Sequence, residues 1–143
     1  SWGVMHHTPN TQRAIDEAFR VLKPGGEAKI MIYHRKSIVG FLLWLRYALL
    51  RFRPATSLDD IYAKYLESPG TKAYSTERAR EMFVKFQKVD IRILLGAGDL
   101  LAKHVGHGHR GPSLSVAKAI WPRFLIRALG KPFGLIMQIR AIK

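Results

Sequence analysis

The chain has 143 residues, with 24 Lys and Arg against 10 Asp and Glu, and a formal net charge of +14. This length suits one domain with a sizeable core, and its 48% apolar and 24% charged residues argue against disorder. Because the chain has no cysteine, a disulfide scaffold, Cys-ligated zinc, an iron–sulfur cluster and a thiol nucleophile are all excluded.

The basic charge is concentrated toward the carboxyl end of the sequence. The net charge is +3 over residues 1–37, +2 over residues 38–75 and +9 over residues 76–143. Asp99 is the last acidic residue, and eight Lys or Arg follow it in 44 residues. Such basicity suggests nucleic acid or an anionic membrane as a partner, although a solvated basic face gives the same pattern.

The first elements predicted along the chain are a helix and a strand. Residues 10–23 form a predicted helix that Asn10 or Thr11 caps, with an apolar stripe at helical spacing. Pro24, Gly25 and Gly26 end this helix. Residues 28–33 then read as a short apolar strand covered on both faces. A helix, a Pro-Gly-Gly turn and a buried strand are typical of an α/β fold.

Residues 38–52 are the most apolar stretch of the chain. A membrane span needs about 20 residues free of interior charge, and Arg46 and Arg51 interrupt this shorter one. The pattern favours a helix buried in the core or in a lid. The alternative is a helix that lies on a membrane surface, so peripheral membrane contact through residues 38–52 stays open.

Residues 57–143 contain further helix and strand signals. The predicted elements are a helix from Ser57 to about Leu66, a helix from Ser75 to about Phe86, a strand over residues 89–95, a helix over residues 113–128 that Pro122 restarts or kinks, and a strand over residues 134–142. Gly96 to Pro112 is a predicted loop, and Gly130 is the expected C-cap of the last helix.

Two sequence blocks flank and end the first helix. Residues 1–11 read Ser-Trp-Gly-Val-Met-His-His-Thr-Pro-Asn-Thr, and residues 20–26 read Arg-Val-Leu-Lys-Pro-Gly-Gly. Together they resemble the segment between the fourth and fifth strands of class I S-adenosylmethionine-dependent methyltransferases of the type 11 branch. A weaker similarity covers residues 68–95, and residues 138–143 are similar to the family's seventh strand. The resemblance therefore spans most of the chain.

The resemblance implies an α/β fold, the C-terminal half of a Rossmann-like class I methyltransferase domain. The family's sheet has the order 3-2-1-4-5-7-6 with strand 7 antiparallel. Residues 1–143 are then one part of a single domain, containing strands 5, 6 and 7, and residues 38–66 are a helical insertion or lid between strands 5 and 6. The family's glycine-rich cofactor loop and ribose-binding acid have no counterpart here, so we expect a C-terminal fragment that is inactive alone.

The same resemblance indicates where the cofactor S-adenosylmethionine would lie. It implies that Ser1, Trp2 and Gly3, at the end of strand 4, pack beside the cofactor, and that His6 and His7 lie at the mouth of the site. Methyl transfer mainly requires donor and acceptor in line, and it needs a base only when the acceptor loses a proton. Either histidine is a candidate base, and a structural hydrogen bond is the alternative role.

Candidate contacts to the methyl acceptor follow the strand over residues 28–33. Tyr33, His34 and Arg35 end this strand, and Arg35 is suited to hold an acidic group, although a solvent-facing strand end is equally consistent. Tyr74 precedes the next helix, either over the pocket or in packing. The expected acceptor is a small molecule or a lipid-like compound.

Metal and nucleic-acid sites are not predicted. His104, His107 and His109 lie in a glycine-rich loop with Asp99 as the nearest carboxylate, so a solvated loop is favoured over a metal site. No nucleic-acid motif is present, and the aromatic residues follow core spacing. A basic, non-enzymatic module that binds anionic membrane or nucleic acid is the alternative to a methyltransferase. A cytoplasmic location is expected.

Overall fold

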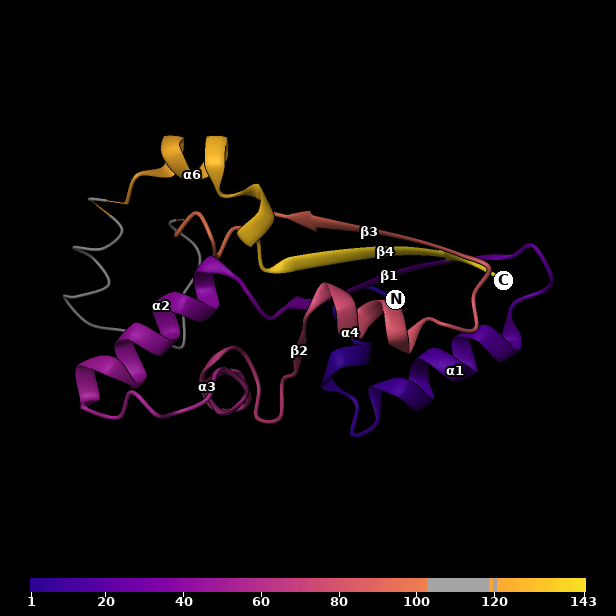
Figure 1. The fold of residues 1–143 in the computed structure, drawn as a ribbon, viewed down its shortest axis with the longest axis horizontal. Coiled ribbons are helices and arrows are strands. Elements are labelled where there is room, and N and C mark those ends of the chain that lie inside the picture. Colours follow the sequence, from indigo (N-terminus) through magenta and orange to yellow (C-terminus); the bar gives the residue numbers. More distant parts are fainter. Residues whose placement is uncertain (103–118, 120) are drawn as a thin grey trace.

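A four-stranded sheet organises the protein, whose computed structural model describes residues 1–102, 119 and 121–143. The strands are β1 (Glu27–His34), β2 (Ala73–Tyr74), β3 (Lys88–Leu94) and β4 (Ile136–Ile142), in the order β2-β1-β4-β3 (Figure 1). β2 runs parallel to β1, whereas β4 is antiparallel to both β1 and β3. The fold is mixed α/β, as predicted, and it is compatible with half of a Rossmann-like domain.

Two helices cover one face of this sheet: α1 (Thr11–Val21) and α4 (Thr76–Met82) (Figure 1). The predicted cap of α1 is confirmed, since the Asn10 side chain accepts the Arg13 amide at 3.0 Å. Ile15 of α1 meets a core that includes Ile30, Ile32, Met82, Phe83, Met137 and Ile139. Burial of this apolar face stabilises the pairing of helices and sheet.

The opposite face of the sheet corrects the prediction of a strand covered on both faces. β1 is continuously buried only over Ile30, Met31 and Ile32. Lys29 pairs with Arg140 in register, and both residues are exposed, as is Arg92 on β3. The antiparallel neighbour β4 accounts for the difference, because antiparallel sheets can leave one face in water.

The apolar stretch over residues 38–52 folds as α2 (Ile38–Tyr47) and a separate 3-10 turn, Leu49–Arg51, rather than as one helix. Phe52 has a positive φ of 56°, and the Arg53 amide bonds back to the Ala48 carbonyl at 2.8 Å. This turn sends the chain to α3 (Leu58–Tyr65), which packs on α2 and has the predicted Ser57 cap. None of the helices among the described residues is long and apolar enough to cross a membrane.

The helix predicted over residues 75–86 is shorter in the structure. Ser75 caps α4 as predicted, but the helix ends at Met82. The Gln87 amide already bonds to the Ile142 carbonyl at 2.8 Å, next to the ladder between β3 and β4. The chain therefore leaves the helix early to enter β3, while Phe83 and Phe86 stay in the core through tight turns.

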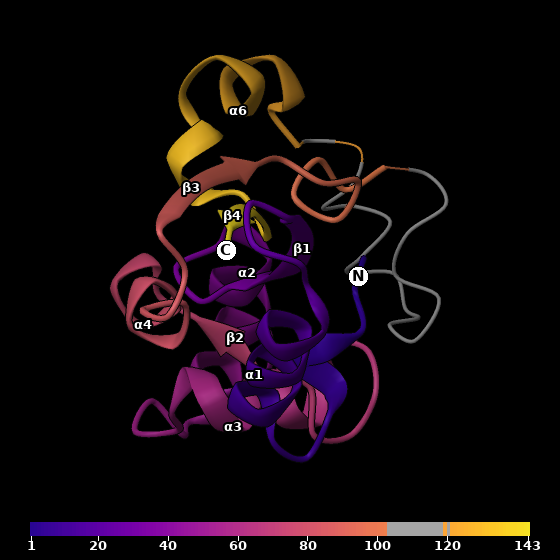
Figure 2. The ribbon, with the colours of Figure 1, turned by 90° about the vertical axis from the view of Figure 1, so that its right-hand side faces the viewer.

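The chain between β3 and β4 is described only in part. The predicted histidine group at residues 104, 107 and 109 and the helix start at residues 113–118 lie outside the described residues. α6 (Arg123–Leu129) begins directly after Pro122, and Gly130 is its C-cap, as predicted, with right-handed rather than left-handed backbone. Figure 2 shows α6 on the β3 side of the sheet and α3 on the far side. A 3-10 turn, Lys131–Phe133, then leads into β4.

The outer edge of β1 is partly covered by residues from the start of the chain. Trp2 forms a parallel bridge with Met31, whose amide donates to the Ser1 carbonyl at 2.9 Å. β2, which the sequence analysis missed, pairs with Tyr33 at the carboxyl end of the same edge. The segment between β1 and β2, which contains α2 and α3, thus leaves and rejoins the sheet at the carboxyl end of β1.

Candidate functional site

The carboxyl end of β1 meets two short segments from elsewhere in the chain. The 3-10 helix Met5–His7 precedes α1, and β2 returns beside β1 after α3. The Lys72 amide, just before β2, bonds to the His6 carbonyl at 3.3 Å and joins the two segments. Of the predicted site residues, the structure brings His6, His7 and Tyr33 together here.

His6 is fully buried at this position. Its ring centroid lies 4.2 Å from that of His7 and 4.2 Å from that of Tyr33. Burial lowers its pKa to about 4, with further contributions from His7 and the Lys72 ammonium, so the ring is neutral at neutral pH. Neither ring nitrogen of His6 has a hydrogen-bond partner.

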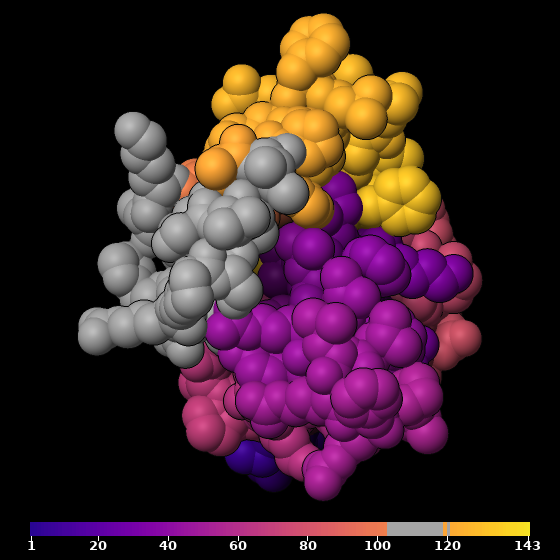
Figure 3. Space-filling model, turned by 90° about the vertical axis from the view of Figure 1, so that its left-hand side faces the viewer, coloured from indigo at the N-terminus to yellow at the C-terminus, as the bar shows by residue number. Residues whose placement is uncertain are grey.

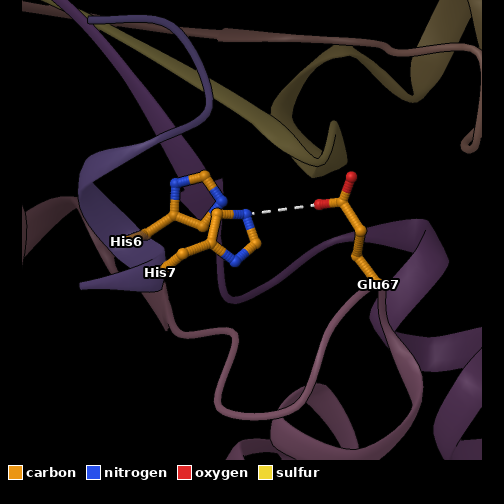
Figure 4. A group of neighbouring side chains, drawn as sticks. All are labelled: His6, His7 and Glu67. Carbon is orange, nitrogen blue, oxygen red and sulfur yellow. Dashed lines mark ion pairs between the residues drawn. The ribbon is translucent and has the colours of Figure 1, made fainter. Parts of the chain in front are cut away.

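His7 is held between a loop and a carboxylate. Its Nδ1 lies 3.1 Å from Ser68 Oγ and 3.2 Å from Thr71 Oγ1. Its Nε2 faces Glu67 Oε2 at 3.4 Å (Figure 4). The exposed fraction of the side chain is 27% for His7 and 55% for Glu67, so the pair is reachable from solvent.

Tyr33 completes the cluster from β1. Its hydroxyl donates to Glu67 Oε2 at 2.8 Å, and burial, followed by the Glu67 carboxylate, raises the tyrosine pKa well above its usual value. Glu67 was not predicted as a site residue, because it lies in a loop without periodicity. The only sequence signal was its position just before Ser68, where the weaker family similarity begins.

The other three residues predicted to contact the methyl acceptor form hydrogen bonds within the protein. His34 is 5% exposed, and its Nδ1 lies 3.2 Å from the Gly134 carbonyl oxygen. Arg35 holds Asp59 of α3 with two hydrogen bonds, at 2.9 Å and 3.2 Å. The Tyr74 hydroxyl donates to Thr11 Oγ1 at 2.8 Å, at the start of α1. Only Arg35 among these reaches the groove described next.

An open groove of about 630 Å3 lies beside this strand end, between α2 and the turn before β4. Its lining residues are mostly apolar: Ile38, Phe41, Trp44, Leu58 and Phe133, with Arg35, Lys36 and Ser37. Figure 3 views this side of the molecule, with α2 and α3 in purple below α6 and the turn before β4 in orange and yellow. The groove offers an apolar wall with basic residues at the β1 end.

The predicted cofactor residues lie along the edge of β1. Gly3 has a positive φ of 71°, and a Cβ there would approach the Met31 side chain at 3.3 Å. The Trp2 indole is 56% exposed.

Comparison with known proteins gives one family. Residues 1–30 match the model of a family described as "Methyltransferase domain", of type 11. No curated protein and no solved structure matches the chain. The match begins at the predicted cofactor residues and ends inside β1, and it includes His6 and His7. It bears out the predicted resemblance for this part of the chain: residues 1–30 are similar to a methyltransferase domain.

Proposed function

We propose that the chain is the C-terminal part of a methyltransferase domain that methylates a small apolar or lipid-like acceptor. The observation that carries this proposal is the family match over residues 1–30. The sheet supports it, because β1, β4 and β3 lie side by side with β4 antiparallel, the arrangement of strands 5, 7 and 6 in the family. In this assignment residues 38–66 form the insertion between strands 5 and 6.

The proposed roles follow from exposure and position. Ser1, Trp2 and Gly3 would pack beside S-adenosylmethionine, which would supply the methyl group to a lone pair of the acceptor. His7 is the better base of the histidine pair, because 27% of its side chain is exposed whereas His6 is fully buried. An acceptor hydroxyl would pass its proton to His7 only when it needs to ionise.

The groove is the proposed site of the acceptor. An apolar lining with few polar groups is typical of small-molecule sites. Arg35 and Lys36 at its β1 end suit an acceptor with an acidic group, and Phe41 and Trp44 suit its apolar part. Exchanging residues 38–66 with the insertion of a related enzyme should change acceptor preference in the complete enzyme. Unchanged preference would remove the groove from the proposal.

Cofactor binding tests the fragment interpretation. In calorimetry with S-adenosylmethionine, residues 1–143 should show no tight binding, because they lack a glycine-rich loop and a ribose-binding acid. A chain extended by the coding sequence upstream of Ser1 should bind the cofactor. Micromolar binding by residues 1–143 alone would contradict the interpretation.

Peripheral contact with a lipid surface is a further part of this proposal. Phe41, Leu50 and Phe52 expose 59%, 68% and 95% of their surfaces, and Arg46 and Arg51 lie among them. Apolar side chains flanked by basic ones are typical of surface-bound helices. In a sedimentation assay with anionic vesicles, the wild-type chain should pellet with the vesicles, whereas the Leu50→Ser/Phe52→Ser variant should stay in the supernatant. Equal pelleting of the two proteins would contradict the proposed membrane contact.

A further inference from the structure

His6, His7 and Glu67 lie together, and two ring nitrogens of this cluster have no hydrogen-bond partner. His6 is fully buried, yet its Nδ1 and Nε2 both lack a hydrogen bond. Unpaired polar groups in the interior cost free energy, so native structures nearly always satisfy them. One of the two nitrogens lies beside the His7 nitrogen that faces Glu67 (Figure 4).

The hydrogen bonds around His7 are compatible with a lone pair on Nε2. Thr71 Oγ1 gives its own hydrogen to the Ser68 carbonyl at 2.7 Å, so toward His7 Nδ1 it can only accept, whereas Ser68 Oγ, 3.1 Å from Nδ1, can donate or accept. In the tautomer with the hydrogen on Nδ1, the lone pair is on Nε2, 3.4 Å from Glu67 Oε2. A cation between this nitrogen and the carboxylate oxygen would stabilise that tautomer.

We propose that His6, His7 and Glu67 bind a divalent transition-metal ion, with Zn2+ as the best match. Each residue offers one ligand atom, and the three atoms lie within 4.8 Å of one another. Two nitrogens and a carboxylate oxygen form a ligand set that suits zinc. Two ligands about 2.0–2.1 Å from one tetrahedral ion lie roughly 3.3–3.4 Å apart, which matches the distance between His7 Nε2 and Glu67 Oε2.

The surroundings hold two of these ligands in place. Thr71 fixes the His7 ring through Nδ1, and the Tyr33 hydroxyl donates to Glu67 Oε2 at 2.8 Å. Hydrogen bonds of this kind orient ligands and strengthen binding in known metal sites. Glu67 lies on a loop with a half-exposed side chain, so it can move toward the ion and leave a fourth position open to water.

This site goes beyond the proposed methyl transfer and is tested without it. A bound ion would occupy the His7 lone pair, so the ion and not His7 would promote ionisation of an acceptor hydroxyl at the open position. Metal binding by residues 1–143 needs no methyl donor. Failure of the metal site therefore leaves the proposed function unchanged, and absence of methyl transfer leaves the metal site unchanged.

The test is zinc binding by the metal-free chain, measured by calorimetry, with Co2+ absorption to report tetrahedral geometry. His104, His107 and His109 are replaced by Gln in every sample, so that zinc bound by those residues does not contribute. We expect one ion per chain and a tetrahedral cobalt spectrum. Tyr33→Phe should weaken binding by about tenfold to a hundredfold, because Glu67 loses its orienting bond.

Glu67→Gln is the decisive variant, with Glu81→Gln as its matched control. The amide oxygen introduced by Glu67→Gln can still accept from the Tyr33 hydroxyl, and Glu81 is an exposed residue paired with Arg78 away from the cluster. We expect Glu67→Gln to weaken zinc binding at least about tenfold and Glu81→Gln to leave it unchanged. Circular dichroism confirms that both variants fold. No zinc binding by the parent, or equal binding by the two variants, overturns the proposal.

Discussion

The hydroxyl of Tyr62 fills the space that a side chain on Gly40 would need: a Cβ there would lie 1.9 Å from the hydroxyl oxygen. This oxygen donates to the Arg35 carbonyl and bonds Ser37 Oγ, each at 2.8 Å. Ser37 Oγ in turn accepts the Gly40 amide at 3.0 Å. The contact ties α3 to the turn between β1 and α2, which also borders the groove.

Gly40→Ala should therefore destabilise the protein. In an exposed helix the change from Gly to Ala adds roughly 1 kcal/mol of stability. Here the new methyl group overlaps the Tyr62 ring, and we expect a net loss of about 1–3 kcal/mol in urea denaturation. The same substitution in a Tyr62→Ala background should cost clearly less. Equal costs in the two backgrounds would show that the two residues do not interact.

Tyr62→Phe should separate the hydrogen bonds from the packing. Burial raises the Tyr62 pKa to about 12, so the hydroxyl keeps its hydrogen near neutral pH and donates it to Arg35. Its removal leaves buried partners unpaired, and we expect a loss of about 1–3 kcal/mol in the free energy of unfolding. Tyr65→Phe, whose ring stacks on Tyr47, is the control and should change stability little. Similar losses for both variants would contradict the assigned role.

Asp99 joins the end of β3 to the start of β4. Its Oδ2 accepts the amides of Gly96 at 2.8 Å and Leu135 at 2.9 Å, while its Oδ1 has no partner. Asp99→Asn keeps an acceptor oxygen for both amides, so stability at neutral pH should be retained or increased. Asp99→Ala loses both bonds and should cost about 1–3 kcal/mol in thermal or urea unfolding. A larger loss for Asn than for Ala would be inconsistent with this role.

The same carboxyl group predicts a pH dependence. Burial raises the Asp99 pKa above its ordinary 3.8, although the amides of Leu135 and Gly96 oppose this shift. The folded protein then holds this proton to higher pH than the unfolded chain does. The stabilisation is complete below the unfolded pKa and is lost as pH rises through the folded pKa. The free energy of unfolding of the wild type should rise relative to that of Asp99→Asn as pH falls from 7 toward 4. A difference between the two proteins that does not change with pH would contradict this prediction.

The covered edge of β1 predicts an effect on association. The Ser1 carbonyl and the Gly3 amide bond to Met31, so deletion of residues 1–3 exposes strand backbone. Exposed strand edges pair with other chains. We expect the deletion to form aggregates, visible in light scattering, at lower protein concentration than wild type. Trp2→Ala retains the backbone bonds and should behave as wild type; aggregation of both variants would point to the indole.

The sequence predicted the elements whose signals are local. Asn10 and Ser57 cap α1 and α3 as expected, and β1, β3 and β4 lie where their apolar patterns placed them. The ends of α2 and α4 were wrong for different reasons. The stretch that begins with α2 is broken by a local turn, in which the Arg53 amide bonds to the Ala48 carbonyl. α4 ends at Met82 because the chain after it enters β3, where Gln87 bonds to the distant Ile142, and no pattern in the helix itself contains that information.

The site was predictable where it coincided with the family's motif or with the end of a predicted strand. His6 and His7 come from that motif, and Tyr33 from its place at a strand end. Glu67 lies in a loop, and its approach to His7 depends on β2, which has only two residues and pairs in parallel with β1. Such a short strand has no periodicity, so its pairing follows from the tertiary fold alone.

The position of β4 has a consequence for how the chain folds. β4 lies between β1 and β3, yet it follows them in sequence, and its Arg140 reaches Glu27 across 113 positions. During synthesis β1 and β3 are therefore complete before the strand that joins them exists. Contacts between such distant positions form slowly, and unpaired strand edges invite association in the meantime. The sheet of the nascent protein thus closes only when β4 has been made. A chain that ends before β4 would leave the edges of β1 and β3 unpaired and would be prone to aggregate.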